Sequence, residues 1–163
     1  RRHSFPTRRS SDLTSNTNKL ERKLAWAASL HEVGMAISHS DYHKHGAYIL
    51  DNADLLGFGM QELHRLSVLI LGQRGKLKKL EAELDEPEFV KLLLALRIAI
   101  ILCHARKEPD HGGLSLRCND LRQLFVLTAD TAWINRYPQS AHLLRQECVA
   151  WERTPWSLHF LNH

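Results

Sequence analysis

Hydrophobic residues recur at every third or fourth position through the first two thirds of the chain, which is the spacing of one helix face. This pattern predicts helices over residues 18–34, 46–52, 61–71 and 86–106. The intervening segments are polar or contain glycine. We interpret them as a histidine-rich connection over 37–45, a turn over 54–59 and a basic loop over 72–79.

The most hydrophobic run of the chain covers residues 89–103 and is interrupted by Lys91 and Arg97. A membrane-spanning helix needs about 20 mainly apolar residues. We therefore interpret this run as a buried core helix in which Cys103 is a small core residue, and we expect no transmembrane segment.

The hydrophobic pattern changes after about residue 107. Alternation of hydrophobic and polar positions indicates two or three short strands among residues 114–118, 124–128 and 133–137 and a final strand over 156–161, with a helix over 141–151 before it. The expected fold is mainly α with a small α+β C-terminal unit. We expect the chain to divide into a helical domain over 14–107 and a small terminal domain over 108–163.

Aromatic residues gather in this terminal unit. We expect them to form its core, because aromatic side chains bury a large apolar area each. They are Phe125, Trp133, Trp151, Trp156 and Phe160.

Residues 1–13, RRHSFPTRRSSDL, show no hydrophobic periodicity. They resemble the translation of a sequencing adapter fused to a truncated reading frame, and such segments are excluded from fold reasoning. A basic disordered tail or a transit peptide is the alternative. On the adapter interpretation, the chain is a C-terminal fragment of a longer protein.

Composition and charge narrow the classes of function. Of 163 residues, 44% are hydrophobic and 25% are charged, which is typical of a globular domain. The net charge is +4, but residues 1–13 hold four arginines and one aspartate, so the rest carries 18 basic and 17 acidic residues. This balance does not favour a nucleic-acid partner. The three cysteines form no CxxC pair, and without a secretory signal we expect a cytoplasmic protein.

Two stretches of sequence carry a family resemblance. Residues 26–40 read WAASLHEVGMAISHS, residues 42–54 read YHKHGAYILDNAD, and Gly57-Phe58 follows. These stretches resemble the C-terminal half of the Ppx/GppA phosphatases, which are exopolyphosphatases and guanosine pentaphosphate phosphohydrolases. The resemblance covers roughly residues 18–161 and implies an HD-like helical domain followed by a small terminal domain.

The resemblance implies that the catalytic machinery lies elsewhere. In that family the glycine-rich phosphate loops, the catalytic glutamate and the magnesium site belong to N-terminal domains that this chain does not contain. We therefore expect a C-terminal region of an exopolyphosphatase that grips polyphosphate and forms a homodimer, with no catalytic residue and no cofactor of its own. Magnesium is expected only for the intact enzyme, and the missing catalytic domains are an expected partner.

Three other interpretations stay open. The chain could derive from a guanosine pentaphosphate phosphohydrolase, since the two enzymes differ largely in the missing half. It could be an independent HD-type metal phosphohydrolase, or an interaction module without phosphate affinity. Metal content separates the HD-type interpretation from the others, and binding to polyphosphate at two salt concentrations separates the interaction module.

The pair His31-Glu32 stands where an HD-type metal site would have its His-Asp dyad. Glutamate is one methylene longer than aspartate, and Ile100 lies about where the later aspartate ligand would be. At most two of four ligands remain, and two ligands do not hold a metal competitively. We interpret His31 and Glu32 as a vestigial pair, with His31 hydrogen-bonded at a helix end and no metal bound.

A second histidine cluster comprises His39, His43 and His45. Two histidines four residues apart share a face of a helix. This segment has the character of a turn, however, and it contains no HExxH arrangement. We expect a polar loop with partly exposed histidines, and metal binding is the alternative.

The basic loop contains Arg74, Lys76, Lys78 and Lys79, with Gly72 and Gly75 between or beside them. Polyphosphate carries a charge on every unit and would be held by a series of cations in a salt-dependent manner. We name these four cations as candidate polyphosphate ligands. The alternative is an ordinary solvated loop that the downstream acidic residues balance.

Overall fold

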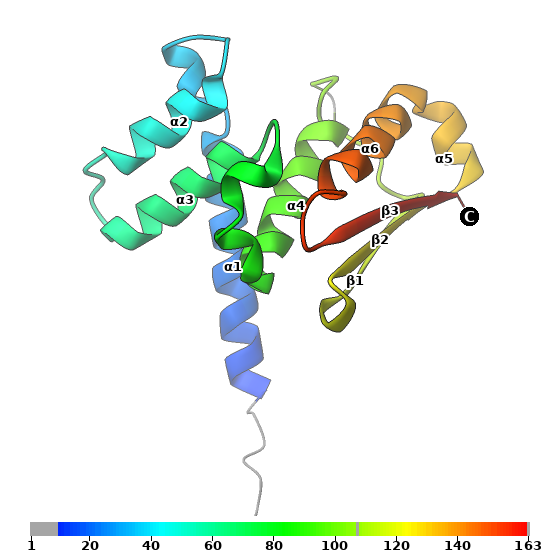
Figure 1. Cartoon of the computed structure of the whole chain (residues 1–163), viewed down its shortest axis with the longest axis horizontal. Coiled ribbons are helices and arrows are strands. Elements are labelled where there is room, and N and C mark those ends of the chain that lie inside the picture. The colour runs from blue at the N-terminus through cyan, green and yellow to red at the C-terminus, as the bar shows by residue number, and fades with distance from the viewer. Residues whose placement is uncertain (1–9, 107, 163) are drawn as a thin grey trace, which may run out of the picture.

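The computed structural model describes residues 10–106 and 108–162, and Figure 1 shows their arrangement. The fold is mainly helical with a small three-stranded sheet near the C-terminus, as the sequence predicted. The helices are α1 (Ser10–Leu30), α2 (Tyr42–Asp51), α3 (Met60–Gly72), α4 (Pro87–Leu102), α5 (Thr131–Arg136) and α6 (Pro138–Trp151). The strands are β1 (Leu114–Asn119), β2 (Leu124–Ala129) and β3 (Ser157–Asn162). The short 3₁₀ helices η1 to η4 cover Val33–Ala36, Leu77–Leu80, Glu83–Asp85 and Asp120–Arg122.

Helix α4 lies at the centre of the molecule. It packs against α1 and α3 on one side and against α6 on another, so its apolar residues face neighbours in several directions. Leu93 and Leu94 are fully buried, which confirms the prediction of a core helix for this run. Cys103 was expected in the core, but it follows the last residue of α4 and is exposed.

The segment expected to be a polar connection over 37–45 is partly helical. Helix α2 begins at Tyr42, four residues before its predicted start, because Tyr42 and His43 are buried in its first turn. Gly34 of η1 lies directly against this turn. A Cβ atom on Gly34 would come within 1.9 Å of the carbonyl oxygen of Tyr42, so only glycine allows the two segments to pack this closely.

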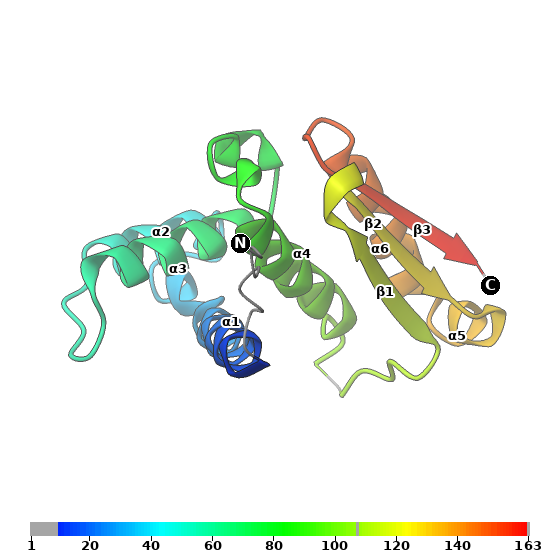
Figure 2. The same ribbon diagram turned by 90° about the horizontal axis from the view of Figure 1, so that it is seen from below.

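The three strands form a mixed sheet in the order β1-β2-β3. Strands β1 and β2 are antiparallel, whereas β2 and β3 are parallel, and α6 provides part of the connection between them. Helix α6 covers one face of the sheet (Figure 2). On that face Phe125 stacks on Trp156 at 5.0 Å between ring centroids and contacts the edge of Trp151. The expected aromatic core is therefore present, with Trp133 also buried and Phe160 partly buried.

The prediction of a strand over 133–137 was wrong, because these residues belong to α5 and its C-terminal cap. Asp130 caps this helix, since its Oδ1 accepts a hydrogen bond from the backbone N–H of Trp133 at 2.5 Å. Pro138 begins the next helix. It occupies the first turn of α6, where a missing N–H has no cost.

Two predicted boundaries, at residue 13 and at residue 107, can be compared with the structure. Helix α1 begins at Ser10, inside the segment 1–13 that was expected to be an adapter remnant or disordered, and residues 1–9 lie outside the described part. The buried residues of the helical part and of the α+β unit form one continuous cluster. The division at residue 107 therefore stays a prediction. Within the described residues, no helix is both long and apolar enough to cross a membrane.

Candidate functional site

A buried arginine holds the basic loop in place. Arg97 of α4 is 6% exposed, and its Nη2 donates to Glu147 Oε2 of α6 at 2.8 Å. Its Nη1 donates to the carbonyl oxygen of Gly72 at 2.6 Å, at the start of the loop. A buried charge is stable only when it is paired and hydrogen-bonded. Arg97 therefore fixes the loop to both α4 and α6.

The loop itself turns at Gly75 and then forms the short helix η2. Gly75 has a φ of +80°, in the left-handed region that favours glycine. Leu77 and Leu80 of η2 are buried, which leaves Lys76 and Lys78 exposed to solvent. The predicted cations are thus presented on a segment that is anchored at both ends.

Arg74 and Lys79 come together across this turn. Lys79 Nζ donates to the carbonyl oxygen of Arg74 at 3.0 Å. The Arg74 guanidinium lies over the ring of Tyr42, 5.7 Å from the ring centroid, and so approaches the first turn of α2. The structure therefore brings the basic loop against α2.

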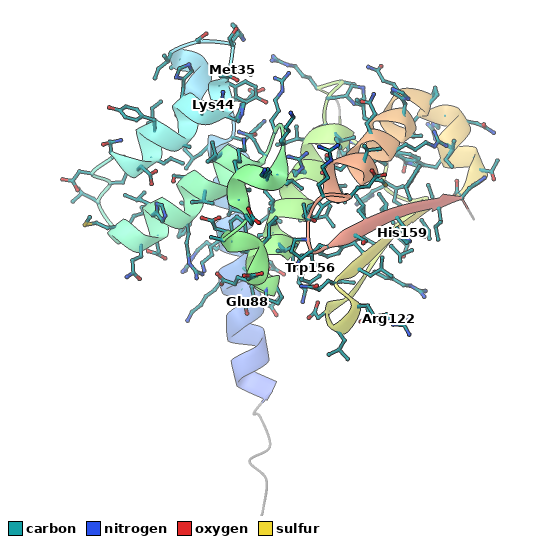
Figure 3. The ribbon with its side chains drawn as sticks, in the orientation of Figure 1. Met35, Lys44, Glu88, Arg122, Trp156 and His159 are labelled. Atoms are coloured by element: carbon teal, nitrogen blue, oxygen red, sulfur yellow. The ribbon has the colours of Figure 1, made fainter. Side chains whose placement is uncertain are left out.

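Two residues of α2, His43 and Lys44, lie beside the cations of the loop. A Cβ atom on Gly75 would lie 3.9 Å from both His43 Nε2 and Lys79 Nζ, so these two groups border the same space. Lys44, in the same turn of α2 (Figure 3), is close enough to affect the pKa of Lys79. We call His43, Lys44, Arg74 and Lys79 the basic cluster. Lys44 also pairs with Asp41 at 3.0 Å.

The pKa values of the cluster reflect this crowding. Burial, followed by the charges of Arg97 and Lys44, lowers the pKa of Lys79 to about 8. Burial and the charge of Lys79 lower the pKa of His43. An anion bound between these groups would offset their repulsion and favour their protonated, positively charged forms.

Two buried polar atoms near the cluster have no hydrogen-bond partner among the described residues. They are His43 Nδ1 and Gln73 Oε1. The amide Nε2 of Gln73 is satisfied, because it donates to the carbonyl oxygen of His31 at 2.7 Å. Gln73 and Arg74 also line an open pocket of about 510 Å³ between the loop, α4 and α6. This pocket and the basic cluster form the candidate site.

His31 and Glu32 are not members of the basic cluster, although the backbone of His31 is hydrogen-bonded to Gln73 of the loop. His31 follows the last residue of α1, and its Nδ1 is 2.6 Å from the carbonyl oxygen of Ala28. His31 Nε2 and Glu32 Oε1 are 3.9 Å apart and both side chains are partly exposed. The interpretation of this pair as vestigial stays a prediction.

The histidines of 39–45 do not form the polar loop that the sequence suggested. His39 is exposed ahead of α2, whereas His43 is buried and His45 half-buried within the helix. In the part of the chain that the structure describes, no three side chains of His, Cys, Asp or Glu are grouped to hold a metal ion.

Sequence reasoning found the loop cations but missed three members of the site. His43 and Lys44 were considered only as part of a histidine-rich segment, and Arg97 only as an interruption of an apolar run. An arginine inside such a run does carry a signal, because a buried arginine requires an acidic partner. Glu147 meets that need on α6, where it lies between the buried residues Leu144 and Trp151.

Comparison with known proteins identifies the class to which this helical region with its small sheet belongs. The family model described as "Ppx/GppA phosphatase, domain III" matches residues 5–148. The chain therefore belongs to the Ppx/GppA phosphatase family and covers its domain III, as the resemblance in the sequence implied.

Curated relatives refine this assignment. A protein of Aeromonas hydrophila subsp. hydrophila is 32% identical over 142 residues, which cover 85% of this chain and 28% of the relative. Proteins of Pseudoalteromonas translucida and Photobacterium profundum are each 31% identical, over 83% and 79% of this chain. All three are named guanosine-5'-triphosphate,3'-diphosphate pyrophosphatase. The chain spans about 28% of the length of such relatives, and their name matches the alternative substrate rather than the exopolyphosphatase expected first.

Proposed function

We propose that the chain is the substrate-holding domain III of an enzyme that hydrolyses guanosine-5'-triphosphate,3'-diphosphate. The observation that carries this proposal is the shared name of relatives that cover four fifths or more of the chain at 31–32% identity. Guanosine pentaphosphate replaces polyphosphate as the preferred substrate. Polyphosphate is kept as a competitor in the experiment.

The basic cluster supports a role in holding phosphate groups. A guanosine carrying a 5'-triphosphate and a 3'-diphosphate presents two short phosphate chains, and several cations on one surface suit such a ligand. Arg74 and Lys79 lie together beside His43 and Lys44, while Lys76 and Lys78 extend the positive surface along the loop. Because Arg97 holds the backbone of the loop, its cations need little ordering when a ligand binds.

A binding experiment tests this role. The 163-residue chain is titrated with guanosine pentaphosphate, GTP and inorganic polyphosphate at about 50 and 200 mM salt. We expect pentaphosphate to bind more tightly than GTP and more weakly at the higher salt. The triple variant Lys76→Ala, Lys78→Ala, Lys79→Ala should lose most of this affinity.

A second triple variant is the control for charge alone. Arg117→Ala, Arg122→Ala and Arg153→Ala remove three exposed cations from the α+β unit, away from the loop. This control should bind as the unchanged chain does. Equal losses in both variants would show a general charge effect and contradict a site on the loop. Tight binding of polyphosphate without binding of pentaphosphate would favour the exopolyphosphatase interpretation.

Hydrolysis is proposed to require the rest of the enzyme. The chain corresponds to little more than a quarter of its relatives, and the resemblance places the catalytic glutamate and the magnesium site in their other domains. We expect no phosphate release from guanosine pentaphosphate or polyphosphate by this chain with magnesium present. Turnover that depends on His31 or His43 would instead support an independent HD-type phosphohydrolase.

A further inference from the structure

The open pocket beside the basic cluster lies between two helix faces. Its volume is about 510 Å³, which is typical of small-molecule sites in proteins. The residues that line it are spaced by three and four positions along each helix, so one face of α4 and one face of α6 border the same space. From α4 and the turn after it they are Arg97, Ile100, Ile101 and His104, and from α6 they are Leu143, Gln146, Glu147 and Ala150.

The walls of this pocket are largely apolar. Four of the lining side chains are hydrophobic and only half-buried, so they leave apolar surface open to a ligand; they are Ile100, Ile101, Leu143 and Ala150. A phosphate chain gains nothing from such surface. A planar base does gain, because the apolar area that it covers is removed from water. The pocket therefore suits a part of the ligand other than its phosphates.

The pocket and the basic cluster meet at Arg74 and Gly75, which both line the pocket. Arg74 is itself a member of the basic cluster. A Cβ atom on Gly75 would lie 3.9 Å from Lys79 Nζ and from His43 Nε2, so the other cluster residues begin at the same point. A nucleotide joins its base to its phosphates through one ribose, and it therefore needs an apolar site and a cationic site side by side.

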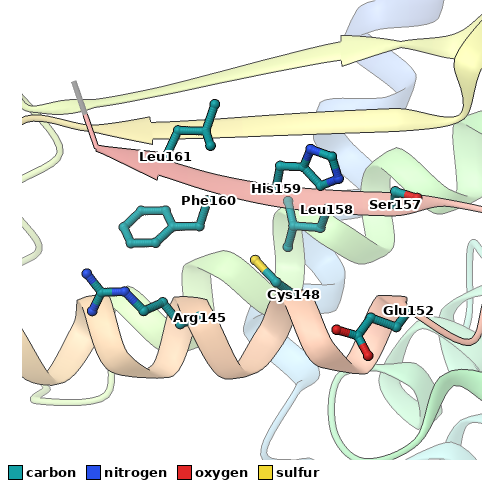
Figure 4. A pocket seen from close by; sticks show the side chains of 8 residues that line it. All are labelled: Arg145, Cys148, Glu152, Ser157, Leu158, His159, Phe160 and Leu161. Atoms are coloured by element: carbon teal, nitrogen blue, oxygen red, sulfur yellow. The ribbon is translucent and has the colours of Figure 1, made fainter.

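A second groove lies on the side of α6 that faces β3 (Figure 4). Its volume is similar, about 430 Å³, and Leu158 and Phe160 give it an apolar wall. None of the described residues that line it belongs to the basic loop or to α2. A ligand in this groove would have its phosphates away from the basic cluster, so the pocket between α4 and α6 is the better site for a nucleotide.

We propose that the pocket between α4 and α6 holds the guanine base of the substrate while the basic cluster holds its phosphates. This inference rests on the proposed function, because it assigns a place to the nucleoside part of guanosine pentaphosphate. Arg74 connects the two sites. One face of its guanidinium lies over the Tyr42 ring, 5.7 Å from the ring centroid, and because Arg74 is exposed its other face is open to stack on a base.

Hydrogen-bond acceptors in the pocket favour guanine over adenine. His104 Nδ1 is 2.7 Å from the carbonyl oxygen of Ile101, which can only accept, so Nδ1 carries the proton and Nε2 of the neutral ring is an acceptor. Gln73 Oε1 is a buried acceptor that has no partner among the described residues. The Watson–Crick edge of guanine carries neighbouring N–H donors at N1 and N2, whereas adenine has an acceptor at N1.

Filling the pocket tests the assignment, with affinities measured by isothermal titration calorimetry on the 163-residue chain. Ala150→Phe places an aromatic ring where the pocket has a methyl group, so guanosine pentaphosphate should bind at least about tenfold more weakly. Inorganic polyphosphate needs only the basic cluster, and its affinity should not change. Val149→Phe is the matched control, because Val149 precedes Ala150 on α6, is 60% exposed and does not line the pocket. This control should bind both ligands as the unchanged chain does.

Two nucleotides with identical phosphates test the preference for guanine. GTP and ATP differ only in the base, and the unchanged chain should bind GTP more tightly. His104→Leu removes an acceptor and should reduce the ratio of the two affinities by about two- to tenfold, which corresponds to one hydrogen bond. Because His104 is exposed, this variant keeps the test decisive if Ala150→Phe does not fold.

The outcomes separate this inference from the proposed function. Pentaphosphate binding that depends on Lys76, Lys78 and Lys79 but is unchanged in Ala150→Phe would overturn the base pocket and leave the proposed function standing. Equal binding of GTP and ATP would do the same. Equal losses of pentaphosphate and polyphosphate in a folded Ala150→Phe variant would also overturn it, since the pocket would then not be separate from the phosphate site. A chain that binds no pentaphosphate would contradict both proposals.

Discussion

Arg97 of α4 and Glu147 of α6 form a buried ion pair between residues that are 50 positions apart in the sequence. Two hydrogen bonds join the guanidinium to the carboxylate, and Trp151 Nε1 donates to the same carboxylate at 2.7 Å. The third guanidinium nitrogen reaches the carbonyl oxygen of Gly72. This one pair therefore connects the core helix, the helix that covers the sheet, and the basic loop.

Removal of one member of this pair should be strongly destabilising. Arg97→Met leaves the carboxylate of Glu147 buried beside the N–H of Trp151 alone, and we expect a loss of about 3–5 kcal/mol in the free energy of unfolding. Urea denaturation followed by tryptophan fluorescence measures this loss. The double variant Arg97→Met, Glu147→Leu removes both charges and should recover part of it. A double variant as unstable as the single one would show that the unpaired carboxylate is not the cause.

Gly34 should tolerate no larger side chain. In Gly34→Ala the new Cβ would lie 1.9 Å from the carbonyl oxygen of Tyr42 and 2.4 Å from the amide nitrogen of Gly46, which are both backbone atoms of α2. Relief requires η1 and α2 to move apart, and we expect a cost of about 1–3 kcal/mol or more in stability. Gly59→Ala is the control, because its Cβ would meet no atom within 4 Å. Thermal unfolding of both variants should show a clear decrease for Gly34→Ala only.

The pKa of Lys79 predicts a pH dependence for phosphate binding. Because burial and nearby cations lower this pKa to about 8, Lys79 is charged at pH 7 and loses its charge as the pH rises above 8. Binding of inorganic polyphosphate should therefore weaken between about pH 7 and 9 at constant ionic strength. Lys79→Arg stays charged over this range, so its affinity should change little. Equal pH dependence in both proteins would show that another group titrates.

The lowered pKa of Lys79 also predicts how the stability of the fold changes with pH. Between pH 8 and 10.5 the unfolded chain keeps the proton of Lys79 while the folded chain has released it. The unfolded state binds more protons, so the free energy of unfolding should rise with pH across this interval relative to Lys79→Met. A difference that falls with pH would contradict the lowered pKa. Denaturation at several pH values provides the measurement.

The parts of the fold that sequence reasoning predicted are those with a long, regular hydrophobic period. Helices α3, α4 and α6 lie within a few residues of their predicted positions, and β1, β2 and β3 match three of the four segments whose alternation indicated strands. The start of α2 was not visible, because its first turn packs against Gly34, whose position would place a Cβ atom against the carbonyl oxygen of Tyr42, and this contact is several residues away along the chain. The candidate site was also only partly predictable, because part of it forms through contacts between segments distant in sequence. The cations of the loop are local in sequence, whereas His43 and Lys44 join them only when α2 and α3 pack together.

Helix α5 shows how a short segment can be assigned to the wrong class. Six residues contain too few positions to distinguish a helical period from an alternating one. The cap at Asp130 is what favours the helix, and it was available in the sequence as an aspartate followed by threonine and alanine.

Asp130→Ala should therefore cost about 1 kcal/mol of stability, since the N–H of Trp133 loses its acceptor. Asp130→Asn keeps a side-chain acceptor and is the control. Chemical denaturation that finds the two variants equally stable would mean that the tertiary contacts of Trp133, and not the cap, hold this helix.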